Sequence, residues 1–237
     1  MTRIILIAAT FFFFNTALFS QSINKTDADG KKHGEWIKKN SQGEILFTGE
    51  FNHGVPVNKF TYYFSDGIVQ AVLHHIGTNG KVNSVAYYHS GAIKSEGSYL
   101  KQQRDNLWKF YNETGTIICE EFYTAGVKSG VSKTYYPSKE LLEEVYYENG
   151  VKSGECKQYF KSGKIKKIVF FKNDVLHGKI IVYRPSGEKM IIGNYDNGSL
   201  SGKWKYFDEN GEIELVEEYQ NGKMIKKISS DWDSEEK

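Results

Sequence analysis

Glycine and aromatic residues recur along the chain at multiples of 24 positions. One glycine column contains Gly43, Gly67, Gly91, Gly115, Gly163, Gly187 and Gly211, with Lys139 in its single gap. One aromatic column contains Tyr63, Tyr87, Tyr111, Tyr135, Tyr159, Tyr183 and Phe207. Eight units of 24 residues fit positions 30–221 without an insertion or a deletion. A fixed period of this length indicates a repeat protein whose units pack against their neighbours.

Each unit has the pattern of two short strands and two turns. In the last unit, residues 202–207 (GKWKYF) are typical of a strand, residues 208–211 (DENG) of a turn, and residues 212–219 of the returning strand. Glycine in the turn supplies the positive φ that a tight hairpin requires. A second aromatic column contains Phe51, His75, Tyr99, Tyr123, Tyr147, Phe171, Tyr195 and Tyr219, and a third contains Trp36, Trp108 and Trp204 alongside Phe60, Cys156 and Ile180.

Lysine and glutamate occupy strand positions on both sides of the alternation. A sheet that is buried on both faces does not tolerate this pattern. We therefore predict an all-β fold, an elongated antiparallel meander of about eight 24-residue β-hairpin repeats that forms a single-layer, twisted open sheet. About 16 strands at a spacing of about 4.8 Å would make the sheet roughly 75 Å long. Aromatic ladders between neighbouring units would stabilise it.

Two segments fit the repeat less well. Residues 138–144 (SKELLEE) have a locally helical pattern, but their place in the 24-residue phase predicts a strand. In the second and third repeats, Val57–Asn58 and Val82–Asn83 replace a glycine, and Ser84 replaces the aromatic residue.

The two ends of the chain differ from the repeats. Residues 1–20 contain Arg3, an apolar run of 11 residues (Ile4–Phe14) and small residues before Gln21, which is the layout of a secretory signal. The alternative is a membrane anchor, which needs about 20 apolar residues. We expect cleavage after Ser20 and export to the periplasm, the cell surface or the medium. Residues 21–29 are expected to be a linker, 30–228 the repeat domain and 229–237 an acidic, disordered tail.

Charge and cysteine content narrow the function classes. Removal of Arg3 lowers the formal net charge from +2 to +1, which disfavours a nucleic-acid binder. The two cysteines, Cys119 and Cys156, would favour a disulfide in an exported protein. The repeat register, however, places two strands between them, a separation of about 14 Å. A disulfide needs Cα atoms within about 7 Å, so no intrachain bridge is predicted.

No residue group has a convincing catalytic pattern. His33 and His177 share one repeat column, which indicates a turn requirement. His53, His74 and His75 are a potential metal group, but His75 occupies an aromatic column and is expected to pack there. The adjacent carboxylates in Glu143–Glu144 and Glu217–Glu218 would point to opposite faces of a strand. Neither cysteine lies in an activating motif. We expect no enzyme activity, no cofactor and no metal.

Two groups of lysines are candidate anion sites. Lys109, Lys133, Lys157 and Lys205 share one column, which would be either a positive stripe for phosphates or lipid headgroups or a solvated face. The second interpretation is favoured because Glu120 and Glu144 are expected near Lys109 and Lys133 on the same face. A denser candidate anion-binding patch contains Lys161, Lys164, Lys166, Lys167 and Lys172.

The repeat unit, with glycines four residues apart before an aromatic residue and an Asn-Gly pair at the junction, resembles the MORN-repeat variant of bacterial proteins. Residues 197–206 (NGSLSGKWKY) and 149–159 (NGVKSGECKQY) match best, and the resemblance covers residues 30–227. It implies paired strands stacked into an elongated open sheet. It also implies roles in protein assembly and membrane-proximal attachment, which are suggested for eukaryotic relatives, while some bacterial members carry an antitoxin-like label.

Three functions are compatible with this sequence. The first is an exported, non-catalytic scaffold in the cell envelope that binds another envelope or secreted protein. Its candidate partner-binding surface contains Trp108, Tyr111, Tyr135, Tyr159, Tyr183 and Trp204. The second is a binding module for anionic lipid or surface polysaccharide, which would use the lysine patch. The third, an antitoxin or immunity-type protein, is implied only by the resemblance.

Overall fold

The computed structural model describes residues 23–229 and contains one antiparallel sheet. Its strands are β1 (Lys25–Thr26), β2 (Lys32–Lys39), β3 (Ile45–Asn52), β4 (Val55–Tyr63), β5 (Val69–Ile76), β6 (Lys81–Tyr87), β7 (Ile93–Leu100), β8 (Gln103–Tyr111), β9 (Ile117–Thr124), β10 (Val127–Lys128), β11 (Gly130–Tyr135), β12 (Leu141–Glu148), β13 (Val151–Tyr159), β14 (Ile165–Lys172), β15 (Val175–Leu176), β16 (Gly178–Tyr183), β17 (Lys189–Asp196), β18 (Ser199–Phe207), β19 (Ile213–Gln220) and β20 (Lys223–Ser229). The expected signal segment 1–20 and residues 230–237 of the expected tail lie outside the described residues.

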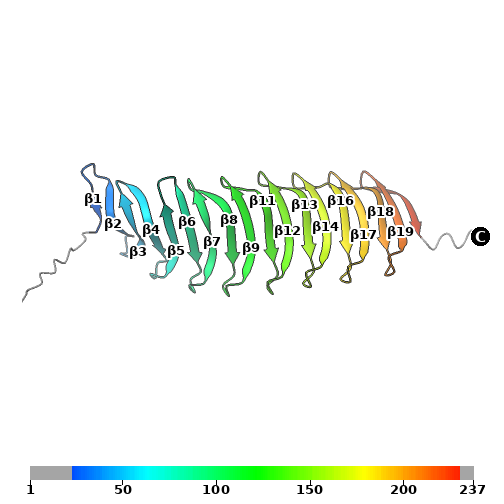
Figure 1. Ribbon diagram of the computed structural model, residues 1–237, viewed down its shortest axis with the longest axis horizontal. Coiled ribbons are helices and arrows are strands. Elements are labelled where there is room, and N and C mark those ends of the chain that lie inside the picture. Colours follow the sequence, from blue (N-terminus) through cyan, green and yellow to red (C-terminus); the bar gives the residue numbers. More distant parts are fainter. Residues whose placement is uncertain (1–22, 230–237) are drawn as a thin grey trace, which may run out of the picture.

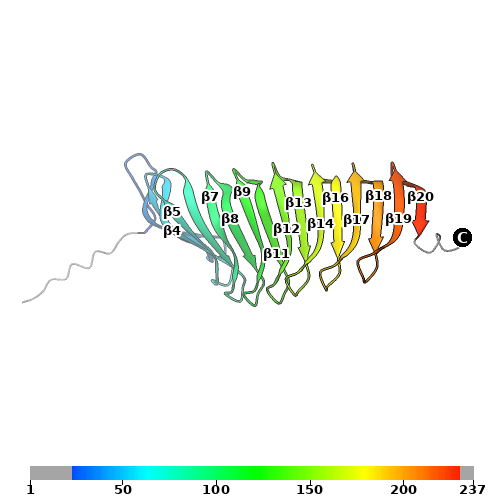
Figure 2. The same ribbon diagram turned by 45° about the vertical axis from the view of Figure 1, so that its right-hand side comes forward.

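The strands lie side by side in chain order. Neighbouring strands pair along the row, except that β10 and β11 both pair with β9, and β15 and β16 both pair with β14. Within residues 23–229, the first and last strands, β1 and β20, have a partner on one side only. Figure 1 shows this row running from the blue end to the red end, and Figure 2 shows the same row after a 45° turn. The predicted open, antiparallel hairpin meander is therefore confirmed.

Eight repeats of 24 residues account for most of the sheet. Repeat 1 is 30–53, repeat 2 is 54–77, repeat 3 is 78–101, repeat 4 is 102–125, repeat 5 is 126–149, repeat 6 is 150–173, repeat 7 is 174–197 and repeat 8 is 198–221. Each repeat contributes one hairpin, although the first strand of repeats 5 and 7 is interrupted after two residues. The short strand β1 precedes the repeats, and β20 follows them as the first strand of an incomplete ninth hairpin.

The turn inside each repeat is held by the same backbone hydrogen bonds. In repeat 4 the Gly115 N–H donates to the Asn112 carbonyl at 3.0 Å, and in repeat 5 the Lys139 N–H donates to the Tyr136 carbonyl at 2.9 Å. Lys139 adopts φ 81° to do so, in a backbone region that glycine occupies without strain. Strand β12 begins two residues later, so the predicted strand is confirmed over residues 141–144, residues 138–140 form the turn instead, and the helical alternative is wrong.

One face of the sheet, which we call the packed face, carries the core. Its central row crosses all eight repeats and contains Trp36, Gly49, Phe60, Leu73, Ser84, Gly97, Trp108, Glu121, Ser132, Val145, Cys156, Val169, Ile180, Gly193, Trp204 and Glu217, each paired with the next residue within its hairpin. Most of the first-strand members of this row are buried. The core is therefore a continuous line rather than a central cluster.

Aromatic rings in this row cover glycines of the preceding repeat. A Cβ atom added at Gly97 would lie 2.4 Å from the Trp108 ring, and one at Gly193 would lie 2.3 Å from the Trp204 ring. Phe60 covers Gly49 in the same way. The indole N–H of Trp108 also donates to the Ser98 carbonyl at 3.0 Å. Each of these rings thus closes the junction between two repeats.

A second link between repeats lies at the turn edge of the sheet. The Tyr88 hydroxyl donates to the Tyr111 carbonyl at 2.8 Å, and the Tyr136 hydroxyl donates to the Tyr159 carbonyl at the same distance. In repeat 7 the Arg184 guanidinium makes the equivalent bond to Phe207. These side chains connect the turns of repeats 3, 5 and 7 to the repeat that follows each of them.

Six of the seven junctions between repeats combine a two-residue loop with a β-bulge. Between β3 and β4, for example, Thr48 pairs with Thr61 and Glu50 with Val57, so Gly49 faces three residues and the second strand holds two extra ones. Asn58 in this bulge has φ 56°. Glycine or asparagine with positive φ occupies the same repeat position at Gly34, Asn106, Gly130, Gly154, Gly178 and Gly202.

The junction between β5 and β6 is the exception. Ile76 pairs with Lys81 across the four-residue turn Gly77–Gly80, and the pairing continues to Ala71 and Ala86 without a shift. The two extra residues lie in the turn instead of in a bulge, which preserves the 24-residue phase. This explains the atypical sequence of repeat 3, because a regular strand can hold Val82 where a bulge needs glycine or asparagine. In repeat 2, Asn58 supplies the positive φ itself.

Candidate functional site

The face opposite the packed face, which we call the open face, exposes a contiguous apolar stripe in repeats 4 and 5. Leu107 lies directly opposite Phe122, and Val131 lies directly opposite Tyr146. Each of the four side chains is exposed by 39–47%. Phe122 also lies against Gly130, with its Cβ 3.7 Å from the position of an added Cβ atom. The apolar stripe (Leu107, Phe122, Val131 and Tyr146) therefore runs unbroken from β8 to β12.

A row of alternating charges lies beside the apolar stripe. It contains Glu96, Lys109, Glu120, Lys133, Glu144 and Lys157, each the Cα partner of the next. The Lys109 Nζ lies 3.9 Å from a Glu120 oxygen, and the Lys133 Nζ lies 3.5 Å from a Glu144 oxygen. Pairs of this kind at a surface contribute about 0.2–1 kcal/mol each. The lysines are offset by carboxylates, as the solvated-face interpretation expects, and form no positive stripe here.

The carboxylates of this charge row also bind tyrosines. The hydroxyls of Tyr111, Tyr135 and Tyr159 donate to Glu96, Glu120 and Glu144 at 2.7, 2.8 and 2.7 Å. Burial and then the bonded carboxylate raise the pKa of each of these three tyrosines to about 12. The contacts repeat with the 24-residue period, so the open face of repeats 4 to 6 is held in one arrangement.

The six aromatic residues expected to form a partner-binding surface do not share one face. Trp108 and Trp204 lie on the packed face with 2% and 6% exposure, because each ring covers a glycine of the preceding repeat. Tyr111, Tyr135 and Tyr159 lie on the open face, half-buried, with their hydroxyls bonded to carboxylates. Tyr183 is also half-buried. That predicted surface is wrong, because the alternation of a strand sends residues three positions apart to opposite faces.

The five lysines of the expected anion-binding patch are dispersed. Lys166 and Lys172 lie at opposite ends of β14, which puts them about 20 Å apart. Lys167 lies on the packed face, opposite Gln158. Lys164 donates to the Ser186 carbonyl at 2.6 Å, and Lys161 lies over the Tyr136 ring at 5.7 Å. The patch is a feature of the sequence that the fold does not assemble.

The environments of the two cysteines and of His75 indicate that these side chains pack within the sheet. Cys119 on β9 and Cys156 on β13 are free thiols with two strands of the meander between them. Burial, with Glu143 nearby, raises the pKa of Cys156 to about 12, which makes it a poor nucleophile near neutral pH. His75 packs edge-on against Phe60, with ring centroids 5.1 Å apart. Within residues 23–229, no three His, Cys, Asp or Glu side chains are grouped to hold a metal ion.

The apolar stripe was not identified from the sequence, although a signal for it was present. Phe122, Tyr146 and Phe170 are separated by multiples of 24 residues and form an aromatic column that begins in repeat 4. In repeats 1 to 3 the same position holds Glu50, His74 and Ser98, which hides the column from a search across all repeats. Across the part of the chain that the structure describes, no helix is long and apolar enough to span a membrane.

Comparisons with known proteins agree with the repeat assignment. The profile of the MORN repeat variant family matches residues 104–125, 128–149, 152–173 and 200–221. No curated protein matches the chain. Among solved structures, the chain is similar over 84% of its length to a chain of the TcdB2-TccC3-Cdc42 complex (11% identity, TM-score 0.25) and to one of the Photorhabdus luminescens Tc holotoxin pore (12% identity, TM-score 0.22). It spans only 13% of the length of each of these chains.

A porin-like protein from Bacteroides uniformis is matched over 81% of this chain and 92% of that chain, at 7% identity and a TM-score of 0.21. Scores this low support no inference about function. The four profile matches fall in repeats 4, 5, 6 and 8, each on a hairpin of the meander and in the phase read from the glycine and aromatic columns. The matched repeats, the period and the fold thus identify a protein built of MORN-type repeats, and such repeats suggest a repeat-based binding or scaffold module.

Proposed function

We propose that this protein is an exported, non-catalytic scaffold that binds another protein of the cell envelope through the apolar stripe. The observation that carries the proposal is the run of four adjacent apolar side chains on the open face, each exposed by 39–47%. An apolar patch rimmed by polar groups is typical of protein–protein interaction sites. The alternating charges of Lys109, Glu120, Lys133 and Glu144 form such a rim along one side.

The stripe is also well prepared for binding. Hydrogen bonds from Tyr111 and Tyr135 to Glu96 and Glu120 fix the neighbouring row, so less side-chain freedom is lost when a partner docks. A hollow of about 340 Å³ next to Val131 and Tyr146 is lined further by Glu144, Glu155 and Lys157. A side chain of the partner could anchor in this hollow, as binding hot spots commonly do.

The docking part of the proposal is tested by charge insertion into the stripe. Phe122→Lys combined with Tyr146→Lys should abolish capture of a stoichiometric protein from the native envelope fraction, while the circular-dichroism spectrum and thermal midpoint stay near those of the parent. The matched control is Leu46→Lys combined with Ile225→Lys, because these residues are exposed by 41% and 58% but lie outside the stripe. Capture that survives the stripe variant, or fails equally in the control, contradicts the proposal.

The export part of the proposal rests on residues 1–20, with Arg3 before the apolar run Ile4–Phe14 and small residues at the expected cleavage point. Mass spectrometry of the protein from fractionated cells should find an N-terminus at Gln21 in the envelope or the medium. A full-length chain confined to the cytoplasmic fraction would show that the segment is no signal.

A further inference from the structure

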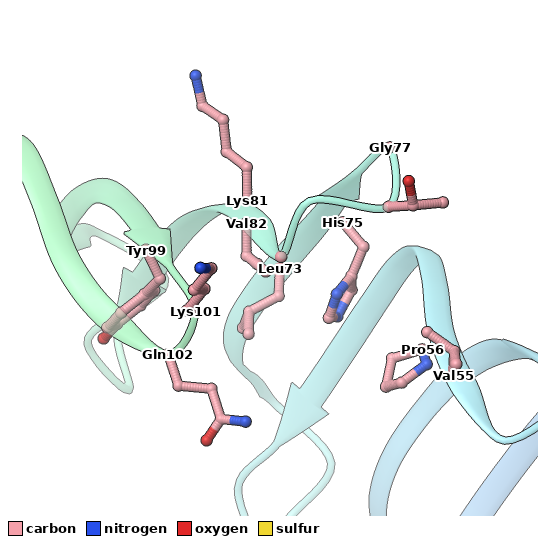
Figure 3. Close-up of a pocket in the computed structure, with 12 residues that line it drawn as sticks. Val55, Pro56, Leu73, His75, Gly77, Lys81, Val82, Tyr99, Lys101 and Gln102 are labelled. Carbon is pink, nitrogen blue, oxygen red and sulfur yellow. The ribbon is translucent and has the colours of Figure 1, made fainter. Parts of the chain in front are cut away.

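The exceptional junction between β5 and β6 creates a cavity on the packed face. The cavity has a volume of about 450 Å³, within the range of small-molecule sites. Apolar groups of Pro56, Leu73, Val82 and Tyr99 line most of it, together with the His75 ring. Figure 3 shows these side chains around the space between β4, β5 and the strand that carries Tyr99.

A missing side chain explains why the cavity lies in repeat 3. In four other repeats, the residue at the third position is cationic. Its side chain lies over the aromatic ring at the position that Tyr99 occupies in repeat 3. The distances from cation to ring centroid are 4.8 Å for Lys32 and Phe51, 5.3 Å for Arg104 and Tyr123, 4.7 Å for Lys128 and Tyr147, and 5.2 Å for Lys152 and Phe171. The corresponding residue of repeat 3 is Gly80, which lies in the four-residue turn and has no side chain to cover the cavity side of the Tyr99 ring, although Trp108 packs edge-on against that ring.

The charged groups around the cavity are basic. Its lining includes Lys81 and Lys101 and contains no carboxylate. Neither lysine forms an ion pair within residues 23–229, and both are exposed. In Figure 3 the Lys101 side chain lies beside Tyr99, whereas Lys81 extends away from the cavity. A positive rim around an apolar interior repels cations and favours an anion that has an apolar body.

His75 adds a hydrogen-bonding group to the interior. Its ring stacks edge-on against Phe60, and no residue in the described part of the chain makes a hydrogen bond to its nitrogens. Burial lowers the pKa of His75, so the ring is neutral near pH 7 and one nitrogen carries a proton that it can donate.

We infer that this cavity binds a small amphipathic carboxylate. Its flat or short-chain apolar body would lie against Leu73, Val82 and Tyr99, and its carboxylate would lie at Lys101. Lys81 would add to the positive potential at the entrance. The site lies on the face opposite the apolar stripe and at a different repeat, so this inference is independent of the proposed protein docking.

The experiment uses 4-phenylbutyrate as the probe and 4-phenylbutylamine as its charge-reversed control, both titrated into the mature protein and followed by NMR. A ligand of this size, buried at ordinary efficiency, is expected to bind with a Kd of about 1 mM. Lys101→Gln should weaken binding of the carboxylate about fivefold or more, whereas Lys203→Gln makes the same change in net charge at an exposed site in repeat 8 and should have no effect. Leu73→Trp, which fills the cavity, should abolish binding.

Three results would overturn the inference: no binding of 4-phenylbutyrate up to about 10 mM, which is well beyond the expected Kd; binding of the amine as tight as that of the carboxylate; or equal effects of Lys101→Gln and Lys203→Gln. Because the two lysine variants change exposed side chains, the test does not depend on whether the Leu73→Trp protein folds.

Discussion

Repeats 3 and 4 have the same length and the same strand order but hold their junctions differently. Repeat 4 enters the sheet through a bulge at Asn106 and places Trp108 over Gly97 of repeat 3. Repeat 3 enters through a four-residue turn, has no bulge and holds Ser84 where repeat 4 has Trp108. The 24-residue phase therefore depends only on the number of residues between equivalent strand positions. The quality of packing depends on whether two of those residues lie in a bulge or in a loop.

The largest difference between the two junctions should appear when the central residue is truncated. Trp108→Ala should lower the free energy of unfolding by about 4 kcal/mol, because a buried indole and its hydrogen bond to Ser98 are lost. Ser84→Ala should cost less than about 1 kcal/mol, because the side chain at this position of repeat 3 is already small. Urea denaturation followed by circular dichroism measures both, and equal costs would mean that the two junctions pack alike.

A smaller effect is expected at the glycine beneath the ring. Gly97→Ala should cost about 2 kcal/mol, because the added Cβ would lie 2.4 Å from the Trp108 ring, which must move. In the background of Trp108→Ala the same substitution should cost almost nothing. This double-mutant cycle isolates the contact between the ring and glycine. If Gly97→Ala costs the same in both backgrounds, the glycine serves the backbone and not the ring.

The residue with positive φ in the turn of a repeat can be exchanged in both directions, from lysine to glycine in repeat 5 and from glycine to lysine in repeat 4. Lys139→Gly should raise the free energy of unfolding by about 1 kcal/mol, because it relieves a lysine held at φ 81°. Gly115→Lys makes the reverse change at the equivalent position of repeat 4, where φ is 77°, and should cost a similar amount. A thermal midpoint that falls in Lys139→Gly would show that the lysine side chain stabilises this turn.

The smallest expected effect is the loss of a tyrosine hydroxyl, which should destabilise the protein in repeat 4 but not in repeat 3. Tyr111→Phe in repeat 4 should cost about 0.5 kcal/mol after allowance for solvent screening, because the hydroxyl donates to Glu96. Tyr87→Phe in repeat 3 should be nearly neutral, because the residue at the position of Glu96 in the preceding repeat is Val72. Urea denaturation of both variants gives the comparison.

The same hydrogen bond has a pH signature. The pKa of Tyr111 is about 12 in the folded protein and about 10 in an unfolded chain, so its stabilising contribution is complete below pH 10 and is lost as the pH rises towards 12. The tyrosinate absorbance of the parent protein minus that of Tyr111→Phe should show a step near pH 12. A step near pH 10 would show that the hydroxyl is neither buried nor bonded to Glu96.

The sequence was sufficient to predict the hairpin meander because its glycines and aromatic residues keep one phase. The strand at residues 141–144 followed from the same phase. The bulges were not predictable in this way, since two residues that move from a bulge to a loop leave the spacing unchanged. The close approach of Trp108 to Gly97 left a trace, because Gly49, Gly97 and Gly193 lie multiples of 24 apart. The role of these glycines, which is to make room for a ring of the next repeat, becomes clear only when the strand on the other side of the junction is known.

The candidate site was harder to predict than the fold. Trp108 and Tyr111 are both large aromatic residues, and only the strict alternation of β8 separates a core side chain from one on the open face. The lysines at 161–172 are neighbours along the chain, but Lys166 and Lys172 lie at opposite ends of the eight-residue strand β14. Proximity in sequence is therefore a poor guide to proximity in an elongated single sheet.

The contacts between repeats have a consequence for the length of the sheet. Rings that cover a glycine of the preceding repeat, and side chains of the turns that bond to the following repeat, join repeats 1 and 2, 3 and 4, 5 and 6, and 7 and 8. Duplicating or losing such a pair of repeats, 48 residues, would preserve these partners and change the span by four strands, or about 19 Å. The length of the sheet can therefore change in fixed steps without a change in the contacts between the remaining repeats.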